Sequence, residues 1–220
     1  IDLVDTTDND GMLRLLDLGE GISAYQITVT KAGFTTDQNM APNETVLSPV
    51  KPLASVVAQD VTEVSFSIDQ VAGMEIETID GYCSVSGGVP VHISGTKLLG
   101  TDPVLKVDDD VITNGSGEYS FTNMEWDNYV FQVSNYDFIG SIPTLPTSLL
   151  PGANQSIQLI LGPNTDHSLL INALDSITGQ PISNASVHVS GGGYDETKVT
   201  GVGFVRQTDW SGGTGQLLYS

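Results

Sequence analysis

The chain has 220 residues and carries 27 aspartates and glutamates against 7 lysines and arginines, which gives a formal net charge of −20 at pH 7. An electrostatic field of that sign repels phosphate backbones, so nucleic acid is not expected as a partner. No apolar run approaches the roughly 20 residues of a transmembrane helix, so no membrane span is expected in this stretch. The 24 glycines and 10 prolines stand in turn-like settings and favour many short strands over long helices.

One unit occurs twice, at residues 5–34 and 111–138. In each copy a glycine-containing turn leads into a short alternating strand, a polar turn and a second alternating strand. This is half of an antiparallel sandwich, and its repetition predicts β-domains in tandem. The matched pairs are Gly11 with Gly117, Leu15 with Phe121, Tyr25 with Tyr129, Val29 with Val133, and Phe34 with Phe138.

Residues 1–70 have the pattern of the later strands of a sandwich. Strands are expected near 12–18 and 23–30, followed by a proline-punctuated crossing. A last strand is expected on Val64, Phe66 and Ile68, which alternate with polar residues.

Residues 71–164 have the pattern of a complete sandwich. Strands are expected at 74–83 and 89–94, the second with Val91 and Ile93 facing the core, and a long loop is expected over 95–110. The repeated half follows, and then a final strand on Ile157, Leu159 and Leu161, which matches the end of the first unit.

Residues 165–220 have the pattern of the early strands of a third sandwich. PVHISG at 90–95 recurs there as SVHVSG at 186–191. We therefore expect three segments, a partial sandwich at 1–70, a complete one at 71–164 and a second partial one at 165–220.

Three motifs carry a resemblance to a known family. GQPISNASVHVSG at 179–191, TNGSGEYSF at 113–121 and TDNDGMLRL at 7–15, with Tyr25 and Tyr129 opening later strands, resemble the carboxypeptidase regulatory-like family, also called prealbumin-like. The resemblance implies an all-β chain of tandem seven-stranded Greek-key sandwiches, Ig-like in type, without catalytic activity or cofactor. It also implies a secreted or surface protein, and RQTDWSGGTGQ at 206–216 is similar to segments of bacterial envelope or pilin-like proteins.

Aromatic residues offer one candidate ligand site. Trp126 with Tyr136 and Tyr82 could form a stacking platform for a glycan, whereas a lone exposed tryptophan is more often a packing residue between domains. Trp210 stands in a turn-like context and is expected to pack under the next strand.

Acidic and histidine residues suggest metal sites only weakly. Asp8, Asp10 and Asp17 lie around Gly11 as in a calcium loop, but the matched copy has Asn114, Ser116 and Asn123 in those places, which favours a structural turn. Asp108–Asp110 are expected on a solvated loop, and His92 and His188 on the outward faces of their strands. No metal site is expected.

Four sequons provide candidate glycosylation sites, Asn43, Asn114, Asn154 and Asn184, all in expected turns or loops. The single cysteine, Cys83, is expected to be a partly buried, inert thiol.

No arrangement of serine, histidine and aspartate, no cysteine and histidine pairing and no phosphate loop can be assembled, so an enzyme is not expected. The sequence favours a non-catalytic, extracellular or cell-surface structural module of a stalk, adhesin or filament. The alternative is a carbohydrate-binding module of the same fold. The expected partners are neighbouring copies or domains of the same protein, arranged head to tail. If residues 1 and 220 are true ends, exchange of half-domains between subunits is expected, and otherwise the chain is a piece of a longer array.

Overall fold

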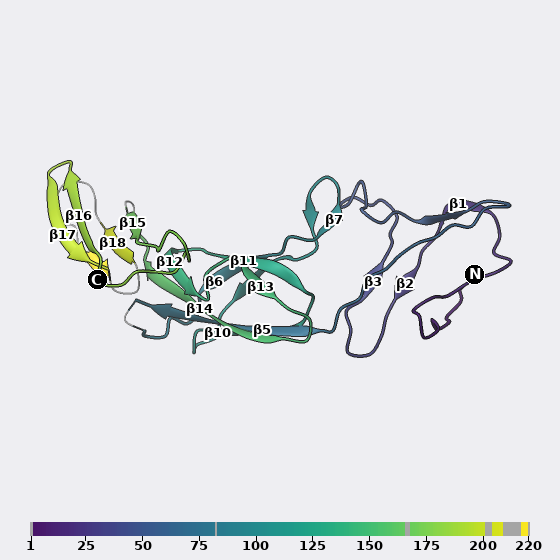
Figure 1. Cartoon of the computed structure of the whole chain (residues 1–220), viewed down its shortest axis with the longest axis horizontal. Helices are drawn as coiled ribbons and strands as arrows, with labels where there is room; N and C mark the ends of the chain where they lie inside the picture. Colours follow the sequence, from purple (N-terminus) through teal and green to yellow (C-terminus); the bar gives the residue numbers. More distant parts are fainter. Residues whose placement is uncertain (1, 82, 166–167, 201–203, 209–216, 220) are drawn as a thin grey trace. The chain divides into compact units, whose positions relative to one another are not determined.

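The computed structural model describes residues 2–81, 83–165, 168–200, 204–208 and 217–219 (Figure 1). These residues form strands and no helix, which confirms the all-β class. The chain divides into two compact units, one of Ile1–Ile68 with Leu98–Val104 and one of Asp69–Lys97 with Leu105–Ser220. The expected three-part division at residues 70 and 164 remains a prediction.

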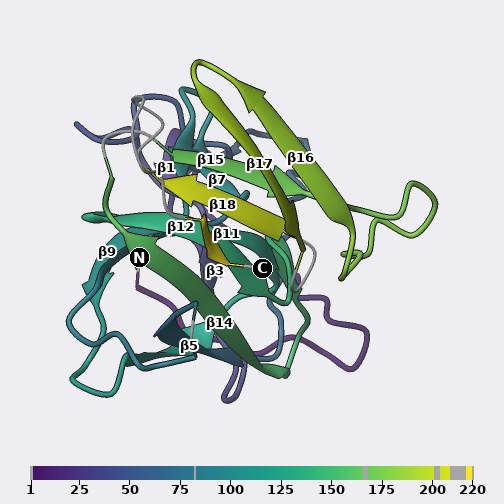
Figure 2. The ribbon, with the colours of Figure 1, turned by 90° about the vertical axis from the view of Figure 1, so that its left-hand side faces the viewer.

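The second unit contains a β-sandwich of two four-stranded sheets, with strand orders β10-β5-β14-β12 and β13-β11-β6-β9 (Figures 1 and 2). Eight strands are thus found where seven were expected, and one of them is a short edge strand at Thr147–Leu149. The strands are β5 (Ala72–Asp80), β6 (Pro90–Ser94), β9 (Asp108–Ile112), β10 (Glu118–Met124), β11 (Asp127–Val133), β12 (Tyr136–Ile142), β13 (Thr147–Leu149) and β14 (Asn154–Pro163).

The core of this sandwich lies between its two sheets. Alternation along each strand sends every second side chain inward, as expected for strands with one buried face. Val91 and Ile93 of β6 are buried, as predicted, and so are Tyr129 of β11 and Ile157 and Leu159 of β14. These residues belong to a single hydrophobic cluster, which holds the two sheets together.

The same unit continues into five further strands. A sheet has the order β15-β18-β19, and β16 and β17 form a separate antiparallel pair. Their bounds are β15 (Ser168–Asn172), β16 (Ser186–Gly191), β17 (Tyr194–Val199), β18 (Phe204–Thr208) and β19 (Leu217–Tyr219).

A buried threonine occupies the same place in the β16–β17 pair as in the β6–β9 pair of the central sandwich. The Thr113 hydroxyl accepts a hydrogen bond from the Val89 amide at 3.0 Å, and the Thr113 amide donates to the Val89 carbonyl at 3.0 Å. The Thr200 hydroxyl and amide make the same two bonds with Ala185, each at 2.9 Å. Both threonines therefore join the start of the PVHISG or SVHVSG strand to the end of its antiparallel partner.

The first unit departs most from the sequence-based expectation. Its strands are short, β1 (Gly21–Tyr25), β2 (Thr28–Val29), β3 (Asp37–Gln38), β4 (Ala54–Val56) and β7 (Leu98–Gly100), which pairs with β8 (Val104–Leu105). The strands expected over 12–18 and on Val64, Phe66 and Ile68 are not formed. A strand requires a neighbour for its backbone hydrogen bonds, and alternation of side chains alone does not supply one.

The prediction of a long loop over 95–110 was also wrong, because this segment contains β7, β8 and the start of β9.

Candidate functional site

The candidate site lies at one end of the central sandwich, around Trp126. Glu125 and Trp126 form the short turn between β10 and β11, and Asp127 is the first residue of β11. Lys97 follows β6, and Lys106 precedes β9. Antiparallel pairing of β6 with both β11 and β9 brings these loops together, although they are separated in sequence.

Asp127 is the buried anchor of this site. Its carboxylate accepts hydrogen bonds from the amides of Thr96 at 2.9 Å, Lys97 at 3.0 Å and Asn128 at 2.7 Å, and from the Thr96 hydroxyl. Burial raises the pKa of Asp127, but these hydrogen bonds together outweigh it, so the pKa lies below its ordinary value. Gly95 leaves room for the carboxylate, since a Cβ there would stand 2.5 Å from Asp127 Oδ2.

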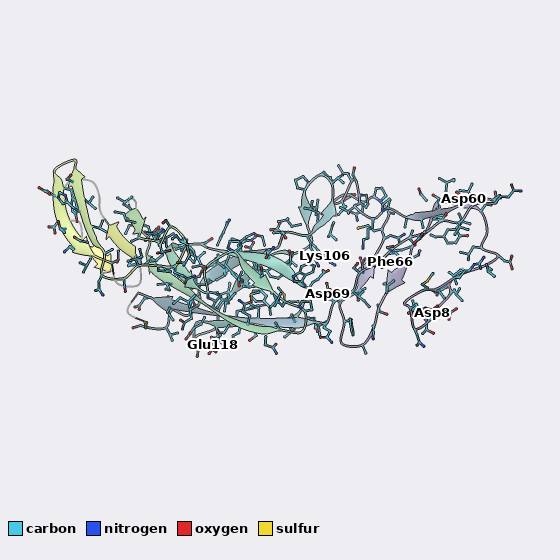
Figure 3. The ribbon with its side chains drawn as sticks, in the orientation of Figure 1. Asp8, Asp60, Phe66, Asp69, Lys106 and Glu118 are labelled. Carbon is cyan, nitrogen blue, oxygen red and sulfur yellow. The ribbon has the colours of Figure 1, made fainter. Side chains whose placement is uncertain are left out.

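Two lysines and two acids form an ion-pair chain above this anchor. The Glu125 carboxylate forms ion pairs with both lysines, Oε1 with Lys97 Nζ at 2.8 Å and Oε2 with Lys106 Nζ at 2.5 Å. Lys97 Nζ also lies 3.5 Å from Asp69 Oδ2. Figure 3 labels Asp69 and Lys106 at this end of the sandwich. Because each lysine faces a carboxylate, the cluster adds no positive patch to the acidic chain.

Trp126 is 48% exposed, and Lys97 Nζ lies 5.0 Å from the centroid of its ring in a cation–π contact. The hydroxyl of Tyr129 donates to the Glu125 carbonyl at 2.9 Å and so fastens the turn that presents the ring. In the first unit Tyr25 donates in the same way to the carbonyl of Gly19, but no aromatic residue stands in that turn.

Tyr136 does not share this site. It begins β12, after the seven-residue strand that Trp126 precedes, so about 20 Å of strand separates them. Its side chain packs against the core. The predicted platform is therefore not assembled from both residues, while Tyr82 and Trp210 lie outside the described residues.

The aspartates near Gly11 form a turn that is repeated bond for bond in the central sandwich. Asp8 Oδ1 accepts from the amides of Asp10 at 3.0 Å and Met12 at 2.8 Å. Asn114 Oδ1 accepts from the amides of Ser116 at 2.8 Å and Glu118 at 3.0 Å. An amide side chain serves as well as a carboxylate here, which explains the turn without a cation.

His92 and His188 each pair with an acid on the neighbouring strand. His92 lies between Asp108 and Asp110, at 3.0 Å from each, and His188 Nε2 lies 2.6 Å from Asp195. Asp108–Asp110 lie in β9, so the prediction that they stand on a loop was wrong. In the described part of the chain, no group of three or more His, Cys, Asp or Glu residues could hold a metal ion.

The four sequon asparagines, Asn43, Asn114, Asn154 and Asn184, are all exposed. Asn154 begins β14, whereas a loop was expected there. Cys83 is exposed rather than partly buried, and it stands in the turn after β5 with a φ of +60°. Glycan attachment at the asparagines stays a prediction.

Sequence patterns did not predict Lys97, Lys106, Glu125 or Asp127, because strand pairing brings together contacting residues that are far apart in sequence, as with Lys97 and Glu125, 28 residues apart, and Thr96 and Asp127, 31 residues apart. The one available signal was Gly95, the glycine that closes PVHISG, which the structure shows to be a close-approach position.

No family model matches the chain, and no curated protein matches it. Similar solved structures include a streptococcal ancillary pilin, with 13% identity and a TM-score of 0.31 over 84% of this chain and 72% of that chain. The Bacillus anthracis TIE protein has 14% identity and a TM-score of 0.32 over 67% of this chain and 26% of that chain. Among the described residues, no helix combines the length and hydropathy needed to cross a bilayer.

Proposed function

We propose that this chain is a non-catalytic structural segment of an extracellular or cell-surface stalk, adhesin or filament, whose β-sandwich modules bear tension. The observation that supports this function is the pairing of the first and last strands of the central sandwich. β5 and β14 are parallel neighbours, in register from Gly73 with Asn154 to Asp80 with Leu161. They lie side by side in Figures 1 and 2.

Parallel pairing places the two ends of the module at opposite ends of one strand pair. The chain enters at Ala72, where β5 starts, and leaves at Pro163, where β14 ends. Tension along the chain therefore slides the strands past each other and loads their hydrogen bonds together. Ile76 and Ile157 are fully buried in this pair, so sliding would also expose the core to water.

Pulling in two directions tests this function. Attachment at residues 72 and 163 shears the β5–β14 pair, whereas attachment at residues 72 and 154 peels β14 away from one end. We expect a clearly higher rupture force in the shear geometry, measured by single-molecule force spectroscopy. Equal forces in the two geometries would argue against a tension-bearing module.

Neighbouring copies or domains of the same protein, joined head to tail, are the proposed partners. A surface location is supported by the charge of −20, which suits a chain that must stay soluble outside the cell. Antibodies raised against the purified chain should label intact source cells. Labelling only after permeabilisation would overturn the location.

Glycan binding is the second candidate, and the exposed ring of Trp126 favours it. Sugar rings stack on aromatic faces, and the Trp126 face opposite Lys97 would be the one used. Titration of polysaccharides against a Trp210→Phe variant, which leaves Trp126 as the reporting indole, should quench its fluorescence. No quenching with any polysaccharide tested would remove this candidate.

A further inference from the structure

Residues 12–18 of the first unit, MLRLLDL, are an apolar segment without a strand partner in the described structure. Leu13 and Leu15 are 45% and 40% exposed, and Met12 and Leu16 are more exposed still. Several exposed apolar side chains on one short segment often mark an interaction surface.

The central sandwich shows what covers the matching segment there. β10 pairs with β5, in the register Tyr119 with Ile76 and Phe121 with Met74. Both aromatic side chains pack against the core. Aligned through Gly11 and Gly117, Leu13 takes the place of Tyr119 and Leu15 that of Phe121.

The turn before each segment fixes this alignment. The side chains of Asp8 and Asn114 accept the equivalent hydrogen bonds described above. The backbone hydrogen bonds of the two turns match as well, and Figure 3 labels Asp8 in the first turn and Glu118 at the end of the second. The Asp8 amide donates to the Met12 carbonyl at 2.9 Å, and the Asn114 amide donates to the Glu118 carbonyl at 2.8 Å. Residues 12–18 thus follow a turn with the same hydrogen bonds as the turn before β10, so their backbone starts in the direction of a strand.

Charge identifies the kind of strand that fits. In the β10–β5 register, Ser120 stands opposite Glu75 and Glu118 opposite Glu77. In the first unit these places are taken by Arg14 and Met12. A glutamate of the β5 type would therefore meet an arginine, and the like-charge pair of the central sandwich would be lost.

We propose that residues 12–18 accept an extended strand of a neighbouring module with the chemistry of β5, apolar at two alternate positions with a glutamate between them. Leu13 and Leu15 bind the apolar side chains, and Arg14 pairs with the glutamate. The inference rests on the proposed function, since it names the strand through which modules join.

A labelled synthetic peptide of residues 71–80, VAGMEIETID, is the probe. Fluorescence anisotropy with the full chain should show saturable binding. The double variant Leu13→Asp/Leu15→Asp should abolish it, and Val61→Asp, at another exposed apolar position of the same unit, should leave it unchanged. All three side chains are exposed, so none of these substitutions disturbs a core.

Charge reversal makes the test specific. Arg14→Glu should weaken binding by about fivefold at low ionic strength, and a peptide carrying Glu75→Arg should restore it. Absence of saturable binding, equal binding by the double variant, or no rescue by the reversed peptide would each overturn the inference. Such results would not affect the proposed function, because the β5–β14 pulling test does not involve residues 12–18.

Discussion

Single glycines hold the turns that the two copies share, and Gly117 is the most constrained of them. Its φ is +74°, and a Cβ there would stand 2.7 Å from the Thr78 carbonyl oxygen. Gly117→Ala should therefore lower the free energy of unfolding by about 3 kcal/mol, because strain at positive φ adds to a clash with rigid backbone. Urea unfolding measures this loss.

Gly115 in the same turn provides the matched control. A Cβ at Gly115 meets nothing within 4 Å, so Gly115→Ala should change the stability by less than about 0.5 kcal/mol. Similar losses for both variants would show that the turn does not require its left-handed glycine.

Asp127 should make the stability of the central sandwich depend on pH. Because its folded pKa lies below the unfolded value of about 3.9, its stabilisation is present above that pH and is lost as the pH falls through the folded pKa. Asp127→Asn should cost about 2 kcal/mol at pH 7, since an amide group would face the Thr96 and Lys97 donors.

The difference in urea midpoint between wild type and Asp127→Asn should shrink below about pH 4. Asp109→Asn, at an exposed position of β9, should change little at either pH. A difference that stays constant down to pH 2 would contradict the role given to the ionised carboxylate.

At the scale of the strand, the buried threonines are the sharpest sign of the repeat. Thr113→Val keeps the shape but removes the acceptor of the Val89 amide, so it should cost about 1–3 kcal/mol. Hydrogen exchange should speed up at the Val89 amide, and Thr200→Val should have the same effect at the Ala185 amide. Unchanged exchange in both variants would contradict the shared role of the two threonines.

Strand prediction succeeded where a partner strand is present. Alternation of Tyr129, Phe131 and Val133, or of Ile157, Leu159 and Leu161, predicts β11 and β14, and both lie in the sandwich. The same alternation at 12–18 and 64–68 predicts strands that are not formed, because the sequence of one segment does not state whether its hydrogen-bonding neighbour is present.

The candidate site was predicted only in part for a related reason. Trp126 stands out in the sequence as an aromatic residue in a turn, and it is exposed. Its ion-pair neighbours Lys97, Lys106 and Glu125 come from loops that meet only after β6 has paired with β9 and β11. No local spacing could have indicated them.

At the scale of the whole molecule, the described residues form an all-β structure in which one turn and one buried threonine contact each occur twice. The all-β class follows from composition and alternation, since glycine and proline punctuate short strands throughout. The pairing of the first and last strands of the central sandwich joins residues far apart in sequence, so it could not be predicted from local patterns and is seen only in the register of β5 with β14. The proposed mechanical function depends on this pairing.

Extension of the full chain, held at its two ends in a single-molecule force experiment, tests the β5–β14 pairing most directly. We predict one cooperative rupture at high force that releases residues 72–163 together, a gain in length of roughly 300 Å. Release of that segment in several smaller steps at low force would contradict it.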